Sequence, residues 1–164
     1  MSYNTIKIKK HSDVIEEYPA HAAIIPGSLV QLNSDGTKGE VLVHATAGGN
    51  VLPMFAIEDE LQGKGIDDAY ATGDQVQVWV PGRGDVVLAI LADGNSVEPG
   101  DFLESNGAGY LQSHTADEAS VLPNVQTNII VGMALENMDA SSDSSGQDVG
   151  GGLGVNKRIK VMIL

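Results

Sequence analysis

The chain of 164 residues contains no cysteine. A disulfide framework and a zinc site with thiolate ligands are therefore excluded. Aromatic residues make up only 4% of the sequence, with one Trp and two Phe, so Val, Ile, Leu and Ala must supply most of the core. A fold built from such small side chains often gains further burial when copies of the chain associate.

Long apolar runs are missing as well. No segment approaches the ~20 consecutive apolar residues that span a bilayer. The first ten residues, MSYNTIKIKK, lack the apolar stretch of a signal peptide. We therefore expect a protein that is made in a cytoplasm and has no membrane partner.

Basic residues are scarce. Nine Lys and Arg stand against 22 Asp and Glu, which gives a formal net charge of −13. An acidic surface repels phosphate, so nucleic acid is not an expected partner. The few cations gather near the two ends of the chain, where we expect them to meet an acidic partner or each other: Lys7, Lys9, Lys10, Lys157, Arg158 and Lys160.

Glycine and proline are scattered between short β-branched segments, with 20 Gly and six Pro in the chain. This pattern is typical of strands separated by turns. It predicts an all-β fold, which we expect to be a compact barrel or a tulip-like β fold. Residues 86–92 (VVLAILA) are apolar throughout, as in a strand that is buried on both faces.

The body of the sequence resembles itself at three places, in the same order. The offsets between the matching segments are 73, 78 and 83 residues. The pairs are IIPGSLVQLNSDGTKG from Ile24 with VEPGDFLESNGAGYLQ from Val97, MFAIEDEL from Met54 with GMALENMD from Gly132, and VQVWV from Val76 with IKVMI from Ile159. A duplicated β unit explains this order, and chance similarity between short segments is the alternative. We assign residues 21–164 to one β domain, with repeat units 24–92 and 97–164.

Two segments differ from the body. Residues 1–20 are predicted to form an extended N-terminal arm, in which Ile6 and Ile8 alternate with Lys7 and Lys9 as in a short half-buried strand. Such an arm either adds to the edge of another protein's sheet or pairs within its own domain. Residues 139–154 (DASSDSSGQDVGGGLG) have almost nothing to bury and are predicted to form a long exposed loop.

No residue pattern indicates catalysis. The four histidines, His11, His21, His44 and His114, are far apart in sequence and match no metal-binding motif. A hydrolase would need one of them beside Asp85, Asp101 or Glu136, and no local context supports this. We expect no enzyme activity, no metal and no cofactor.

Trp79 is the only tryptophan. Residues 75–80 alternate, with Val76, Val78 and Val80 on one face, and Gln75, Gln77 and Trp79 on the other. An aromatic side chain on the wetter face of a strand is often an anchor in an interface between subunits. The second interpretation is that Trp79 caps the core of its own domain.

Four segments together resemble the head decoration (cement) proteins of tailed bacteriophages: IPGSLVQL, EPGDFLESNGAGYL, VGMALENMD and KRIKVMIL. The resemblance spans roughly residues 20–164 and rests on structural rather than catalytic motifs. It implies a structural virion protein on the outer capsid surface, commonly a homotrimer, which stabilises contacts between major capsid subunits.

In such a protein the N-terminal arm would contact the capsid. The candidate contact residues are Tyr3, Ile6, Lys7, Ile8, Lys9 and Lys10. The alternative function is a module displayed on the capsid that binds host surface or glycan, with Trp79 and residues 139–154 as its tools.

Overall fold

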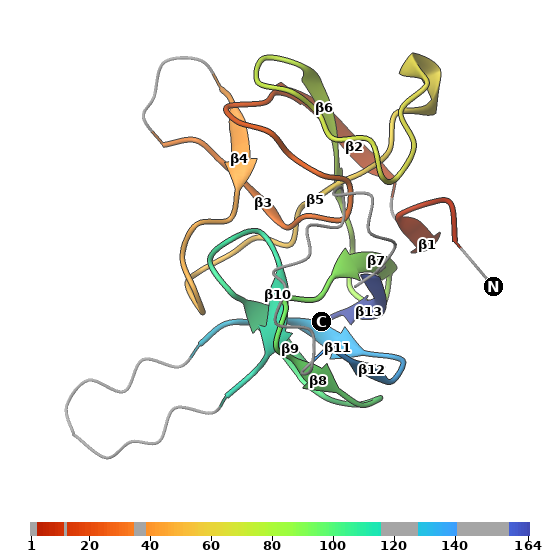
Figure 1. Ribbon diagram of the computed structural model, residues 1–164, viewed down its shortest axis with the longest axis vertical. Helices are drawn as coiled ribbons and strands as arrows, with labels where there is room; N and C mark the ends of the chain where they lie inside the picture. The colour runs from red at the N-terminus through yellow and green to blue at the C-terminus, as the bar shows by residue number, and fades with distance from the viewer. Residues whose placement is uncertain (1–2, 12, 35–38, 116–127, 141–157) are drawn as a thin grey trace.

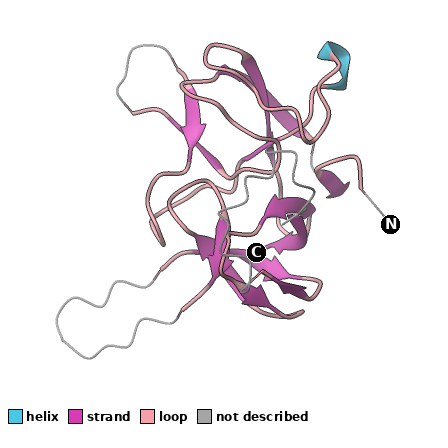
Figure 2. Ribbon diagram, viewed as in Figure 1, coloured by secondary structure: helices cyan, strands magenta, loops and turns pink. Residues whose placement is uncertain are grey.

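The computed structural model of the chain describes residues 3–11, 13–34, 39–115, 128–140 and 158–164. Within these residues the chain forms short β-strands and one turn of 3-10 helix, η1 (Glu60–Gln62), so the predicted all-β class is confirmed (Figure 2). The strands are β1 (Lys7–Lys9), β2 (Val14–Pro19), β3 (Val30–Leu32), β4 (Val41–Val43), β5 (Phe55–Ala56), β6 (Gln75–Val80), β7 (Val86–Ile90), β8 (Ser96–Val97), β9 (Phe102–Ser105), β10 (Leu111–Ser113), β11 (Ile130–Ala134), β12 (Met138–Asp139) and β13 (Arg158–Ile163). No helix in the described ranges has the length and apolar character that crossing a bilayer requires.

The strands form several open antiparallel sheets. One sheet has the order β1-β7-β13-β11-β9-β10, a second has the order β2-β6-β5, and β3-β4 and β12-β8 form two further pairs. These sheets do not close into a barrel, which corrects the expectation of a barrel. The physical reason is that isolated bridges, Leu29 with Phe55 and Ala20 with Val41, join the β3-β4 pair to its neighbours where a barrel would need continuous ladders.

An arrangement of five strands occurs twice. In the N-terminal unit (residues 14–80), β2 pairs with β6, β6 with β5, and β3 with β4, while a bridge between Leu29 and Phe55 joins β5 to the segment before β3. In the C-terminal unit (residues 86–163), β7 pairs with β13, β13 with β11, β11 with β9, and β9 with β10. Figure 1 shows the first set of strands in the upper half of the molecule and the second set in the lower half.

The two units also match in register. Phe55 lies opposite Trp79, and Met133 lies opposite Met162. Met133 follows Phe55 by 78 residues and Met162 follows Trp79 by 83 residues, which are two of the offsets of the sequence repeat. The next backbone bond matches too, because Ile57 N–H donates to Gln77 and Leu135 N–H donates to Lys160, both at 2.9 Å. A duplicated β unit would produce this agreement in register.

The boundary between the units differs from the one expected. The sequence division placed residues 86–92 in the first repeat, 24–92. In the structure β7 pairs with β13 in the way that β2 pairs with β6. β7 is therefore the first strand of the second unit. Sequence comparison missed this because β2 (VIEEYP) and β7 (VVLAI) share almost no residues.

The predicted loop 139–154 is described only at its start. Asp139 ends β12, which pairs with β8, and Ala140 is buried. Residues 141–154 lie outside the described part of the chain.

Trp79 is fully buried, which corrects its assignment to a subunit interface. Its side chain belongs to the main core with Leu29, Phe55 and many residues of the C-terminal unit, whereas Val76 and Val78, on the opposite face of β6, belong to a second cluster. The alternation in residues 75–80 predicts one buried face and one solvent-facing face. In the structure the face that carries Trp79 is also buried at that residue, because the C-terminal unit covers it.

The two glutamines of this strand do lie at or near the surface. Gln75 is exposed, and the half-buried Gln77 donates from Nε2 to Glu17 Oε1 at 3.1 Å. Without the tryptophan they offer no apolar anchor for a partner.

Replacing Trp79 with Ala should therefore lower the free energy of unfolding by about 3–5 kcal/mol, the usual cost of removing a large aromatic side chain from a core. Chemical denaturation followed by circular dichroism would measure this. Gln77→Ala on the same strand is the control and should change stability by less than about 1 kcal/mol. A Trp79→Ala protein with unchanged stability would contradict the core assignment.

Candidate functional site

The N-terminal segment is part of the fold. β1 pairs with β7 in antiparallel fashion, with Lys7 opposite Val87 and Lys9 opposite Val86 across an irregular register. β2 pairs with β6 over its whole length. Of the two alternatives for residues 1–20, the described residues therefore follow the second, pairing within their own domain, and the expectation of a separate extended arm is wrong for them.

Two buried carboxylates hold this segment in place. Glu58 accepts hydrogen bonds from the Ile6 N–H at 3.0 Å and from the Thr5 hydroxyl. Asp85, which has no exposed surface, accepts from the His11 N–H and, at 2.7 Å, from the Gly82 N–H. Because a buried carboxylate is costly without donors, these bonds make the position of residues 5–11 a condition of the fold.

The six candidate contact residues divide into two groups. Ile6 is completely buried and Ile8 is half-buried against the main core, so both serve packing rather than contact with a partner, which corrects their assignment. Tyr3 is half-buried too, and the Lys160 Nζ lies 4.6 Å from the centre of its ring. Lys9 and Lys10 are exposed and Lys7 is half-buried, so these three lysines lie at the surface. Lys7 and Lys10 both pair with Asp13, at 3.8 and 2.5 Å.

The cations of this region come from neighbouring strands. β1, which carries Lys7 and Lys9, lies beside β7, and β7 lies beside β13, which carries Lys160 (Figure 1). Lys10 Nζ binds Asp13 at 2.5 Å, and this hydrogen bond lowers the pKa of the Asp13 carboxyl. The pKa of Lys160 is raised, first by its hydrogen bond with Tyr3 and then by Glu136 at 3.3 Å.

Lys9 differs from these neighbours. It forms no ion pair with any residue that the structure describes, although it is exposed at the edge of the six-stranded sheet. We call Lys7, Lys9 and Lys10 the lysine edge. It is a cationic strip on a strongly acidic chain.

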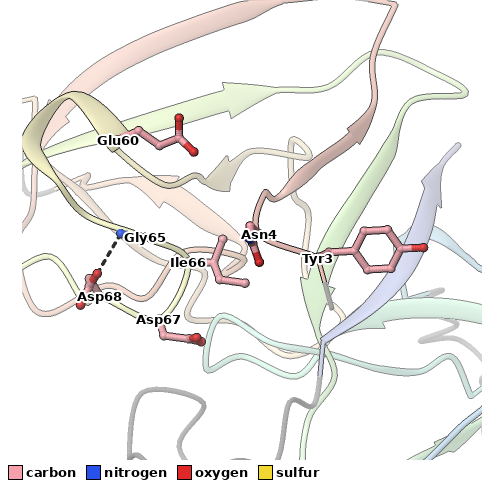
Figure 3. Close-up of a pocket in the computed structure, with 7 residues that line it drawn as sticks. All are labelled: Tyr3, Asn4, Glu60, Gly65, Ile66, Asp67 and Asp68. Carbon is pink, nitrogen blue, oxygen red and sulfur yellow. Dashed lines mark hydrogen bonds between the residues drawn. The ribbon is translucent and has the colours of Figure 1, made fainter. Parts of the chain in front are cut away.

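A polar pocket of about 380 Å³ is lined in part by residues that precede β1 (Figure 3). Its lining comes from the N-terminal segment, from η1 and from the loop after η1: Tyr3, Asn4, Glu60, Gly65, Ile66, Asp67 and Asp68. Figure 3 shows that the three carboxylates do not converge on one point. Asp68 accepts from Gly65 N–H at 2.8 Å and Asp67 pairs with Arg158 at 2.7 Å, so two of the three already have partners. Among the described residues no group of three or more side chains is arranged to hold a metal ion.

The histidines lie in four separate places. His11 is 3.0 Å from Asp85, His21 is 2.8 Å from Glu40, His44 is 2.7 Å from Ser105 and His114 is 2.7 Å from Glu104. The pair of His11 and Asp85 has the proximity that a hydrolase would need, which the sequence did not indicate. The Asp85 carboxylate, however, is buried and bound to backbone N–H groups on both of its oxygens. This geometry serves to fix a turn to the N-terminal segment.

We expect Asp85→Ala to release the N-terminal segment, because the N–H groups of His11 and Gly82 lose their acceptor. The free energy of unfolding should fall by about 2–4 kcal/mol. Amide hydrogen exchange of residues 6–11 should become faster.

Asp101→Ala is the matched control for this change. Asp101 also accepts a backbone N–H three residues earlier, at 2.9 Å, but it is exposed, so the loss should stay below about 1 kcal/mol. Equal effects of the two substitutions would show that Asp85 has no special role in holding residues 6–11.

Comparison with known proteins identifies no relatives. No protein-family model matches the sequence, and no curated protein matches it.

Proposed function

We propose that this chain is a head decoration protein of a tailed bacteriophage. It binds the outer surface of the assembled capsid as a homotrimer and stabilises contacts between major capsid subunits. No catalytic step is part of this proposal, and the site of action is the virion surface.

The observation that carries the proposal is the lysine edge. On a chain with a net charge of −13, Lys7, Lys9 and Lys10 lie together on the edge strand β1 and the residue that follows it. Such an edge is attracted to an acidic surface, while the rest of the molecule is repelled by it. The molecule would bind in one orientation.

The resembling segments support the proposal in a second way. IPGSLVQL leads into β3 and EPGDFLESNGAGYL covers β9 and the start of β10, which are matching hairpin strands of the two units. KRIKVMIL covers β13, the central partner of β7 and β11. The resemblance thus follows the framework of the fold rather than a few surface residues.

Trimeric binding on a lattice would convert weak contacts into stable attachment. One exposed ion pair contributes at most about 1 kcal/mol. Three linked copies that engage three equivalent capsid sites raise the overall affinity far above that of a single contact. The acidic body would face solvent and keep virions apart.

The alternative function, binding to host surface or glycan, relied on an exposed Trp79 and on residues 139–154. Trp79 is buried. Residues 141–154, which make up most of that loop, lie outside the described part of the chain. No observation favours this function over capsid binding.

Lys9→Gln should weaken binding to purified undecorated capsids by about fivefold per contact, equivalent to about 1 kcal/mol. Truncation is a poorer test, because removing residues 2–10 also removes Ile6 from the core. The matched control is Gln75→Glu, which lowers the net charge equally at an exposed position on β6 of the other unit. Occupancy can be measured by gel densitometry of sedimented particles. Equal losses for the two variants would point to net charge rather than the lysine edge, and full occupancy of Lys9→Gln would remove the edge from the proposal.

Sedimentation velocity of the free protein should show a trimer, or a monomer that forms trimers only on the capsid. A stable dimer would contradict the proposal, because it cannot occupy a threefold position symmetrically.

A further inference from the structure

The two units differ at one edge. In the C-terminal unit, the outer edge of β7 is covered: Leu88 N–H donates to Ile6 O at 2.8 Å and Ile90 N–H donates to Gly27 O at 3.2 Å. The counterpart of β7 is β2, which pairs with β6 on one side and is the edge of its sheet on the other. Within the described residues no strand covers this second edge.

The register identifies the backbone groups that point outward from β2. Ile57 N–H donates to Gln77 O, so the backbone of Gln77 faces β5. Backbone groups alternate along a strand, and therefore Val76 and Val78 face β2 and bind their partners Tyr18 and Glu16. The N–H and C=O groups of Ile15 and Glu17 consequently point away from the sheet.

At the C-terminal end of β2, a proline limits the number of outward backbone N–H groups. Pro19 lies opposite Gln75, at the position that corresponds to Ile90 opposite Arg158 in the other unit. Ile90 has its N–H bound to Gly27, whereas Pro19 has no N–H to satisfy. The open edge is therefore short and centred on Ile15 and Glu17.

The charge of the edge indicates what fits there. Val87 and Leu88 of β7, which lie beside β1, are buried and apolar. The corresponding residues of β2 are the exposed acids Glu16 and Glu17. Val14, at the start of β2, is 47% exposed and adds an apolar contact. The strand that covers β7, with the sequence KIK flanked by Ile6 and Lys10, has the complementary pattern of apolar and basic residues.

We propose that the outer edge of β2 binds an extended segment of a partner protein in which apolar residues alternate with lysine or arginine. The segment pairs antiparallel with β2, as β1 pairs with β7, and its cations lie along Glu16 and Glu17. β1 of a second copy is not this segment, because Ile6 is buried in its own core and its N–H is bound by Glu58. The proposal is independent of the capsid role.

The probe is a capped synthetic peptide with the sequence of residues 5–11, TIKIKKH, added to the full-length protein. Nuclear magnetic resonance should show binding with shifted and exchange-protected amides at Ile15 and Glu17. A peptide with the three lysines replaced by Glu should not bind. The affinity for the basic peptide should fall as salt is raised, because exposed charge pairs are screened.

Three variants separate charge from backbone pairing. Glu16→Lys should weaken peptide binding about tenfold or more. Glu98→Lys, the same charge change at an exposed position outside β2, should leave it unchanged. Glu17→Pro removes an outward N–H and the exposed side-chain bond from Gln77, but no backbone bond to β6. It should therefore abolish binding while a thermal melt shows that the protein stays folded.

Several outcomes would overturn the proposal. One is no binding at about 1 mM peptide, weaker than the usual range of specific recognition. Another is protection at amides outside β2, or equal losses for Glu16→Lys and Glu98→Lys. Self-association of the protein that Glu17→Pro abolishes would show that a second copy occupies the edge instead. A failure here leaves capsid binding through the lysine edge untouched, since that is measured on particles with Lys9→Gln.

Discussion

The burial of one face of the N-terminal unit against the C-terminal unit is the interaction on which the rest of the structure depends. Leu29, Phe55 and Trp79 lie side by side across paired strands and have no exposed surface. They share one core with Val161, Ile163 and other residues of the C-terminal unit. Each unit alone is a set of short, open sheets, which are marginal in water. The shared core makes one stable domain from two units.

The two units match in strand pairing but are not equivalent in burial. The counterparts of Leu29, Phe55 and Trp79 are Phe102, Met133 and Met162, which pair in the same register. Phe102 is 45% exposed, and the two methionines are half-buried. The same framework positions therefore form the main core in one unit and a surface in the other. Strand edges diverge in the same way, since β1 covers β7 while β2 has an open edge.

Sequence pattern revealed the strand framework and the repeat, but not which faces are covered. The glycines and prolines between short β-branched segments predicted the all-β class because these signals are local. The burial of Trp79 and Ile6 depends on contacts with residues far along the chain. The alternation of apolar and polar residues within one short strand cannot predict such contacts. The bonds from Glu58 and Asp85 to residues 5–11 were missed for the same reason. A signal for Asp85 was present, however, in the turn that precedes it.

That turn recurs and explains part of the acidity. Asp74, Asp85 and Asp101 each accept the backbone N–H three residues earlier, and a strand begins at the next residue in each case. The preceding residue is a glycine with positive φ, 85° at Gly84 and 103° at Gly100, a conformation that side chains disfavour. These three carboxylates thus close turns, as acids do in proteins of any function. Lys9, by contrast, forms no ion pair with any residue that the structure describes, and its position on the edge strand β1 is the more informative signal for binding.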